Sequence, residues 1–267
     1  MISPNQMSTL STNKITKHFD GVYAVDGLSL SFEPGKVTSL IGPNGSGKST
    51  LINTITGIHQ IDGGMVLVGR DTVLSKIRRY DVPTYEITRT FQDVRLFEQM
   101  TVLDNILVVL TERNTTEALF EKHKTFHLEK AEEVLNRVGL WNPPSHKASG
   151  GQVKQNELAA NLSYGQRKLL EIARILAMTH SPTGEAKIFF FDEPFAGLFP
   201  EMVKIVSSVI KELKEKGKTV ILVEHNMDLI RELSDHIFVL DAGKLLAEGK
   251  PEEVLARKDV IEAYLGE

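Results

Sequence analysis

A glycine-rich stretch near the N-terminus has the residue types and spacing that suit binding of nucleotide phosphates. Gly42-Pro43-Asn44-Gly45-Ser46-Gly47-Lys48-Ser49-Thr50 fits the pattern G-x-x-x-x-G-K-[ST]. The glycines let backbone N–H groups turn toward phosphate oxygens, and a helix beginning there adds its positive dipole. Lys48 can reach the β- and γ-phosphates, and the Ser49 hydroxyl can bind Mg²⁺. An apolar strand pattern before the stretch and a helical pattern after it favour a phosphate site over an ordinary glycine-rich turn.

A second chemical signal is a pair of acids at the end of an apolar run. Residues 187–191 have the pattern of a buried strand, and Asp192 and Glu193 follow directly. Ligands of open α/β sheets bind at the carboxyl ends of the strands. We therefore predict that Asp192 binds Mg²⁺, directly or through water, and that Glu193 polarises an attacking water. Two acids in a turn after a core strand are common, so this interpretation depends on the phosphate loop upstream.

A short Ser/Gly loop at residues 162–166 runs into a predicted amphipathic helix. Such a loop presents the N–H groups of a helix N-terminus, which predicts a second phosphate site. The residues of this site are Ser163, Tyr164, Gly165 and Gln166. Because the two phosphate sites are far apart in sequence, we expect ATP to be held between two chains. Residues 149–152 read Ser-Gly-Gly-Gln, but only a weak apolar stripe follows them, so the later loop is favoured.

The elements that must position these residues read as an alternation of strands and helices. Residues 37–41 and 220–223 have buried-strand patterns, 24–32 alternate like one strand, and 237–247 read as a hairpin. Apolar stripes typical of helices occur in two segments, formed by Leu128, Ala131, Val134, Leu135 and Val138, and by Met202, Ile205, Val206, Val209, Ile210 and Leu213. This order predicts an α/β core with a mainly helical insert between about residues 93 and 184.

Composition narrows the class of protein. A net charge of -4 and a pI of about 6.1 give no support for nucleic-acid binding. The sequence contains no cysteine, which excludes disulfides, thiol catalysis and cysteine-bound zinc, and suits the cytosol. No apolar run approaches the roughly 18 residues that a spanning helix needs, and the N-terminus lacks a secretory signal pattern. We therefore expect any membrane role to come through a partner.

These motifs together resemble those of ABC-type ATPase subunits, and the resemblance covers nearly the whole chain. It implies an α/β fold, a P-loop NTPase core with an antiparallel β subdomain and an inserted helical subdomain. The expected boundaries are a single domain over 8–267, with the nucleotide-binding core at 8–92 and 185–250. The helical subdomain would occupy 93–184 and a C-terminal helix 251–267. Residues 162–166 would be the signature loop, which binds the γ-phosphate of ATP seated on the opposite subunit.

The resemblance also assigns roles to individual residues. Gln92 looks like the Q-loop glutamine, which contacts Mg²⁺ and water and hinges the helical insert. His225 looks like the switch histidine, which contacts the γ-phosphate and orders Glu193. Residues 196–200 occupy the position of the loop that joins the two active sites, and Phe19 resembles the aromatic that stacks on adenine, with Tyr23 as a rival. The implied catalytic residues are Glu193, His225, Gln92 and Lys48, and the implied metal ligands are Ser49, Gln92 and Asp192.

Further details are similar to one subgroup, the ATP-binding subunits of importers for branched-chain amino acids, which includes urea and short-amide importers. These details are residues 88–92, 95–97 and 100–102, the Tyr-Gly-Gln signature and the closing residues 262–267. The resemblance implies a Mg²⁺-dependent ATPase, peripheral on the inner face of the cell membrane. Its partners would be a second ATP-binding subunit, membrane permeases and an external substrate-binding protein. Small insertions at 149–161 and 181–186 depart from the pattern. A lipopolysaccharide-export ATPase and a soluble ABC ATPase without a permease remain alternatives.

Overall fold

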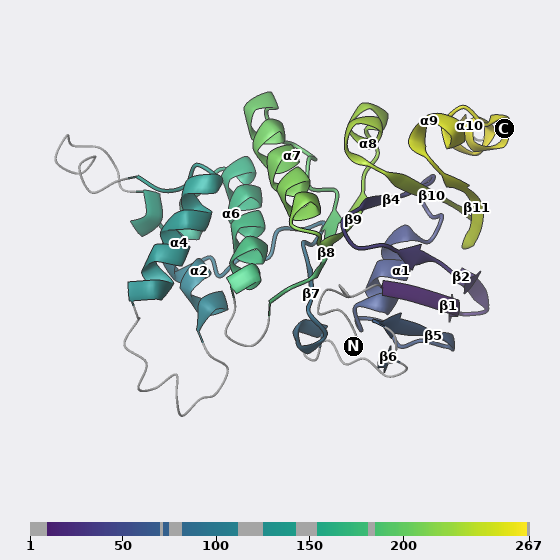
Figure 1. Cartoon of the computed structure of the whole chain (residues 1–267), viewed down its shortest axis with the longest axis horizontal. Coiled ribbons are helices and arrows are strands. Elements are labelled where there is room, and N and C mark those ends of the chain that lie inside the picture. The colour runs from purple at the N-terminus through teal and green to yellow at the C-terminus, as the bar shows by residue number, and fades with distance from the viewer. Residues whose placement is uncertain are drawn as a thin grey trace, which may run out of the picture. The chain divides into compact units, whose positions relative to one another are not determined.

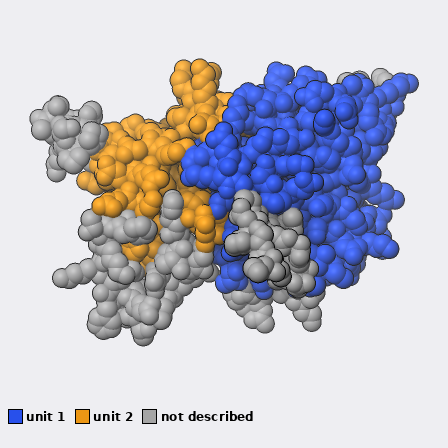
Figure 2. Space-filling model, viewed as in Figure 1, with its two compact units in different colours: residues 1–87, 187–193, 209–267 blue, residues 88–186, 194–208 orange. Residues whose placement is uncertain are grey.

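The computed structural model describes residues 10–69, 72–74, 82–111, 125–142, 154–180 and 185–265. The chain divides into two compact units, which Figure 2 distinguishes by colour. Unit 1 consists of residues 1–87, 187–193 and 209–267, and unit 2 of residues 88–186 and 194–208. The segment predicted to be helical, 93–184, thus falls within unit 2, and the C-terminal segment falls within unit 1.

Unit 1 is built on two sheets (Figure 1). The first is antiparallel, in the order β2-β1-β5-β6 with β3 beside β1; its strands are β1 (Leu10–Phe19), β2 (Val22–Leu28), β3 (Ser31–Phe32), β5 (Gly63–Val68) and β6 (Thr72–Leu74). The second has the order β11-β10-β4-β9-β8-β7; its strands are β4 (Val37–Ile41), β7 (Ile87–Arg89), β8 (Ile188–Asp192), β9 (Thr219–Val223), β10 (His236–Asp241) and β11 (Lys244–Gly249). Strands β10, β4, β9 and β8 run parallel, and β11 pairs antiparallel with β10 as the predicted hairpin.

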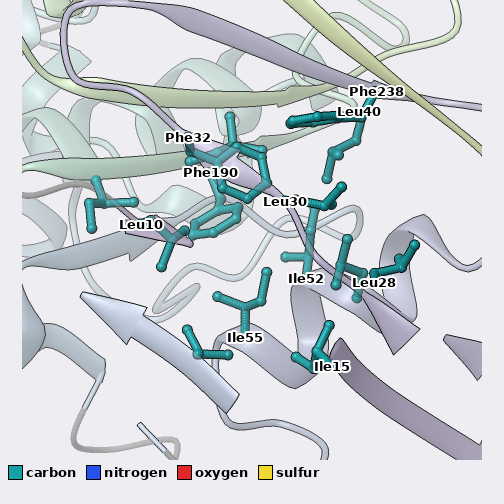
Figure 3. Close-up of a cluster of buried hydrophobic side chains, with 14 of the residues drawn as sticks. Leu10, Ile15, Leu28, Leu30, Phe32, Leu40, Ile52, Ile55, Phe190 and Phe238 are labelled. Atoms are coloured by element: carbon teal, nitrogen blue, oxygen red, sulfur yellow. The ribbon is translucent and has the colours of Figure 1, made fainter. Parts of the chain in front are cut away.

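Helix α1 (Lys48–Ile55) is fixed by the main hydrophobic core of unit 1. Its residues Ile52 and Ile55 pack with Leu10 and Ile15 of β1 and with apolar side chains of β4, β8 and β10 (Figure 3). All of these side chains are almost fully withdrawn from solvent. Since α1 follows the phosphate loop directly, burial of its apolar face holds the loop at the carboxyl end of β4.

The opposite face of the parallel sheet is covered by short helices. Ile41, Ile237 and Val239 alternate along their strands with residues of the main core, and they pack against α8 (Met227–Leu233), α9 (Pro251–Val254) and α10 (Lys258–Leu265). The C-terminal segment therefore contains two helices where one was expected over 251–267. Arg257, in the break, forms a two-pronged ion pair with Asp259 in the first turn of α10, and Asp259 Oδ1 also accepts the N–H of Val260, one of the N–H groups that a helix start leaves without an intrahelical partner.

One strand expected from the sequence is interrupted. Residues 24–32 form the end of β2 and the separate strand β3, because the Thr12 hydroxyl donates to the carbonyl of Leu28 and accepts the N–H of Leu30. Between the stretches where β2 and β3 pair with β1, the segment is thus bonded to the Thr12 side chain as well as to the Thr12 N–H, which donates to the Leu30 carbonyl oxygen at 2.8 Å. The α/β fold class, with an antiparallel sheet and a helical part, is confirmed.

Unit 2 is mainly helical. Helices α2 (Val102–Leu110) and α4 (Thr125–Arg137) pack against α6 (Tyr164–Ala177), and short 3₁₀ turns occur at η2 (Lys154–Asn156), η3 (Ala159–Asn161) and η4 (Met178–His180). The stripe predicted for α4 is buried at Ala131, Val134 and Leu135, but Leu128 is 40% exposed. The remaining helical elements are η1 (Val82–Tyr85) in unit 1 and α7 (Pro200–Glu215), which begins in unit 2 and ends in unit 1. Within the described ranges, no helix has the length and apolarity needed to cross a membrane.

Candidate nucleotide site

The predicted catalytic residues of unit 1 lie at the carboxyl ends of three neighbouring parallel strands, at one edge of the sheet. The phosphate loop follows β4, Asp192 and Glu193 stand at the end of β8, and His225 follows β9, which lies between them. In register, Asp192 of β8 and Leu40 of β4 both stand opposite Val223. The sheet therefore brings three sequence segments together at the edge where open α/β folds bind ligands.

The phosphate loop requires glycine at two positions for lack of space. Gly47 has a φ of +100°, and a Cβ there would lie 2.2 Å from the carbonyl oxygen of Ala24. Gly42 has a φ of +146°, and its Cβ would lie 2.1 Å from the carbonyl oxygen of Leu240. No side chain fits at either position without displacing backbone. The backbone of the loop is thus held against neighbouring strands while its tip, at Asn44 and Gly45, is exposed.

Lys48 is folded into the loop. Its Nζ donates to the carbonyl oxygens of Gly42, at 2.8 Å, and Pro43, at 2.9 Å, and more distantly to the Ser46 hydroxyl. Burial lowers the pKa of Lys48, and the negative charges of Glu193 and Asp192 act in the opposite direction. The Lys48 ammonium group is therefore a buried cation within electrostatic range of Asp192 and Glu193, and its charge suits it to bind an anionic phosphate.

Glu193 and His225 form a pair across the ends of β8 and β9. His225 Nε2 lies 3.1 Å from Glu193 Oε1, and the N–H of Glu193 donates to the Val223 carbonyl oxygen at 3.0 Å. Glu193 has a φ of +47°, a left-handed conformation that is costly for a residue with a Cβ. Strain of this kind is found where the surroundings enforce a functional side-chain direction.

His225 is positioned by its own neighbour, Glu224, which the sequence did not single out. The Glu224 carboxylate is buried, and its Oε2 accepts the N–H groups of His225 and Asn226. Asn226 in turn caps α8, with its Oδ1 accepting the N–H groups of Asp228 and Leu229. The turn that carries His225 is therefore fixed on both sides.

The donor set for a divalent cation consists of oxygens. Ser49 is exposed at the first turn of α1, and Asp192 is buried at the end of β8. A hydroxyl and a carboxylate, with phosphate oxygens completing the sphere, are the hard ligands that Mg²⁺ prefers. Across the described ranges, no cluster of three or more His, Cys, Asp or Glu side chains could hold a metal ion unaided. The residues therefore fit Mg²⁺ that arrives with a nucleotide.

Two exposed aromatics compete for the base of the nucleotide. Phe19, at the end of β1, is 43% exposed, and Tyr23, on β2, is 55% exposed. The edge of His59 meets the Phe19 ring at a centroid distance of 5.2 Å, and Lys17 Nζ lies 5.1 Å from the centroid of that ring. Both side chains remain available for stacking, so Phe19 stays a prediction.

The signature loop begins a helix, as the sequence predicted. Ser163 is the N-cap of α6: its hydroxyl accepts the N–H of Gln166, and the Gln166 side chain accepts the N–H of Ser163. This reciprocal capping box satisfies the N–H groups of Ser163 and Gln166, and Ser163 and Tyr164 at the start of the helix are exposed. The competing copy at residues 149–152 lies outside the described residues.

The unusual tyrosine of the signature loop packs on the joining loop of the same unit. A Cβ on Gly197, whose φ is +72°, would lie 2.9 Å from Cε1 of Tyr164. The buried Lys168 Nζ donates to the Ala196 carbonyl oxygen at 3.4 Å and lies 5.7 Å from the centroid of the Tyr164 ring. The signature loop and the joining loop are thus in direct contact within one chain.

Gln92 is exposed in unit 2, in a loop anchored by a residue that sequence reasoning missed. Glu171 Oε1, from α6, accepts the N–H groups of Phe91, at 3.2 Å, and Arg95, at 3.5 Å. Its other oxygen, Oε2, is buried without a hydrogen-bond partner among the described residues. Burial raises the pKa of Glu171 to about 7, against the opposing effects of the two N–H groups, Arg174 and Lys168. An acid inside the apolar run of α6 was the signal that could have revealed it.

We expect Glu171 to make the stability of the chain depend on pH. Because its pKa is raised on folding, Glu171 stabilises the fold fully below its ordinary pKa of 4.5, and this contribution is lost as the pH rises through about 7. The free energy of unfolding of the wild type, relative to that of Glu171→Gln, should therefore fall between about pH 4.5 and pH 7 and then level off. Denaturant unfolding across this range checks the difference. Exposed Glu129→Gln on α4 is the control, and parallel curves for the wild type and Glu171→Gln would contradict the assignment.

The fold and the strand-end geometry together define a P-loop ATPase. Residues 25–196 match the family model described as ABC transporter. The chain belongs to the ABC transporter family and is an ATP-hydrolysing subunit of the ABC cassette type. A second model, described as branched-chain amino acid ATP-binding cassette transporter, matches residues 244–267.

The similar proteins span the full length of the chain. It is 38% identical over 260 residues to the high-affinity branched-chain amino acid transport ATP-binding protein LivG of Escherichia coli K12, covering 97% of this chain and 98% of the relative. It is 36% identical to the corresponding protein BraF of Pseudomonas aeruginosa, over 97% of this chain and 98% of that relative. A solved ATP-binding cassette of an ABC transporter, in its ADP conformation, matches with a TM-score of 0.78 and 36% identity, over 98% of this chain and 100% of the other.

Proposed function

We propose that this chain is one of two ATP-binding subunits that power import of branched-chain amino acids or related polar small molecules. The observation that carries the ATPase part is the convergence of Lys48, Asp192, Glu193 and His225 at the ends of β4, β8 and β9. The substrate class is supported by the full-length similarity to LivG and by the match of residues 244–267.

In the proposed reaction, Lys48 and the N–H groups of residues 42–50 bind the phosphates of ATP. Ser49 and Asp192, with Gln92, would hold Mg²⁺, which neutralises phosphate charge when bound. Glu193 accepts a proton from the attacking water, and His225 orients Glu193 and contacts the γ-phosphate. Phe19, with Tyr23 as the alternative, stacks on adenine.

The second half of the site would come from a partner subunit. Ser163, Tyr164, Gly165 and Gln166 would complete the ATP site of the opposite chain, with their helix N-terminus toward the γ-phosphate. ATP binding would close the two subunits head to tail, and hydrolysis would release them. The division proposed from the sequence, a core at 8–92 and 185–250 and a helical part at 93–184, would pass this motion through Gln92 to a permease.

The proposed assembly places the chain at the inner face of the cell membrane. Its partners would be a sister or identical ATP-binding subunit, two permeases and, indirectly, an external substrate-binding protein. The test is co-expression with permease and external-subunit genes from the same genome, purification of the membrane complex and reconstitution into liposomes. ATP hydrolysis should rise when the external subunit is loaded with leucine, isoleucine or valine. A complex that hydrolyses ATP without responding to these amino acids would contradict the substrate class, and one without hydrolysis would contradict the ATPase role.

A further inference from the structure

The C-terminal helix reaches the phosphate loop through one hydroxyl group. Tyr264, near the end of α10, accepts the N–H of Gly42 at a distance of 2.6 Å. Gly42 is buried, so an unpaired N–H there would be costly. Both residues belong to unit 1 although 222 positions separate them. Tyr264 lies in the closing segment 262–267, which resembles one subgroup of the family and falls within the match of residues 244–267.

The Tyr264 ring is seated in an apolar cluster that also contains the residue before Gly42. Ile41, Ile237 and Val260 belong to this cluster, and Tyr264 packs against it. Burial raises the pKa of Tyr264 to about 12, against the opposing effect of the Gly42 N–H, so the hydroxyl is neutral at physiological pH. The ring thus anchors α10 to the end of β4, and the anchored ring directs its hydroxyl at the first residue of the loop.

Gly42 is restrained on its carbonyl side as well. Its oxygen accepts from Lys48 Nζ at 2.8 Å, while its Cα packs so closely that a Cβ would lie 2.1 Å from the Leu240 carbonyl oxygen. The Tyr264 hydroxyl and the Lys48 ammonium therefore hold the two sides of the same residue. A phosphate that bound Lys48 Nζ would compete with these carbonyl oxygens, and the Tyr264 bond to Gly42 would not be affected by that competition.

We propose that Tyr264 is a positioning residue of the nucleotide site, which fixes Gly42 and so pre-forms the phosphate loop for binding. This inference rests on the proposed nucleotide-binding role of residues 42–50. By thermodynamic reciprocity, a contact that favours nucleotide binding must itself be favoured by nucleotide. The packing of α10 against the end of β4 and the binding of nucleotide therefore favour each other, and the closing segment stabilises the ATP site.

The test is Tyr264→Phe in the full-length chain, a change that keeps the ring in its apolar cluster and removes only the hydroxyl. The dissociation constant of MgADP, measured by calorimetry, should rise about fivefold, the usual effect of one lost hydrogen bond. The melting temperature measured without nucleotide should fall by a few degrees, because the buried Gly42 N–H loses its partner, and the increase that MgADP produces should shrink. Ile261→Ala, on an exposed position of the same helix, is the matched control and should bind MgADP like the wild type.

Hydrogen exchange gives a second readout. MgADP should slow amide exchange of residues 258–265 in the wild type, and this protection should be lost in Tyr264→Phe. Unchanged MgADP affinity in Tyr264→Phe, equal weakening in Ile261→Ala, or absence of protection in the wild type would each overturn the inference. A melting temperature lowered equally with and without nucleotide would also overturn it, since that result marks a purely structural contact. Failure of the wild type to bind MgADP would instead overturn the proposed function.

Discussion

Glu193→Gln should lower ATP turnover by about a hundredfold or more while ATP binding is retained, because the amide cannot accept a proton from water. Glutamine keeps the size of the side chain and an oxygen within reach of His225, so the pair across β8 and β9 can still form. The substitution removes one of the two negative charges near Lys48, that of Glu193, and leaves that of Asp192. This loss does not weaken the attraction of Lys48 for phosphate. The variant should therefore accumulate in the ATP-bound, dimeric state. Steady-state turnover, together with size-exclusion chromatography in MgATP, measures both properties.

A matched control for this prediction is Glu248→Gln, on an exposed position of β11. It makes the same chemical change far from the acid pair in sequence, and it should turn over ATP like the wild type. Undiminished turnover in Glu193→Gln would remove Glu193 from the proposed role of general base. Loss of ATP binding in the same variant would show that its carboxylate holds the site together instead of activating water.

Ser163→Arg should abolish turnover, because it alters the N-terminus of α6 that is proposed to face the partner's ATP. The hydroxyl that accepts the Gln166 N–H is lost, and a long side chain is placed at an exposed cap where the γ-phosphate would bind. Loss of a preorganised donor set at a phosphoryl group typically costs about a hundredfold or more in rate. MgADP binding to the chain's own phosphate loop should persist, since that loop lies in unit 1.

The control is the same substitution in the similar stretch upstream, Ser149→Arg, which should be nearly silent. Turnover assays of the two purified variants decide between the copies. Activity lost in Ser149→Arg and kept in Ser163→Arg would reverse the assignment of the signature loop. Loss of activity in both variants would show that a new arginine is harmful at either position, and the comparison would then not support the assignment of residues 162–166.

Predictions made from the sequence succeeded where a short segment dictates its own structure. The spacing of glycines with Lys48 predicted a phosphate loop, and the structure places helix α1 and strand β4 on its two sides. The apolar run ending in Asp192 predicted a buried strand, which is β8. Ser163 was expected to open a helix and is its N-cap. These features follow from hydrophobic periodicity and capping chemistry, which act over a few residues.

Predictions were less accurate where a remote residue intervenes. The strand expected over 24–32 is divided because Thr12 bonds to Leu28 and Leu30. Leu128 is exposed on α4 because the buried surface of that helix is narrower than its apolar stripe. Glu171 and Glu224 carried no recognisable motif, although each fixes the backbone beside a predicted catalytic residue. Glu171 binds the N–H groups of Phe91 and Arg95, which become its neighbours only in the folded chain, whereas Glu224 binds those of the next two residues, in a turn that no sequence motif marks.

The groups that could carry out chemistry can be recognised from the amino-acid sequence without knowledge of the fold. Residue types and local spacing specify a phosphate loop, an acid pair and a capped helix, because each needs only the chain's own short-range geometry. Tertiary structure decided how these parts are held: His225 meets Glu193 through the pairing of β8 with β9, and Tyr264 meets Gly42 across 222 positions. Contacts between residues so far apart in sequence depend on the path of the whole chain, so the spacing of residues within a short segment cannot predict them.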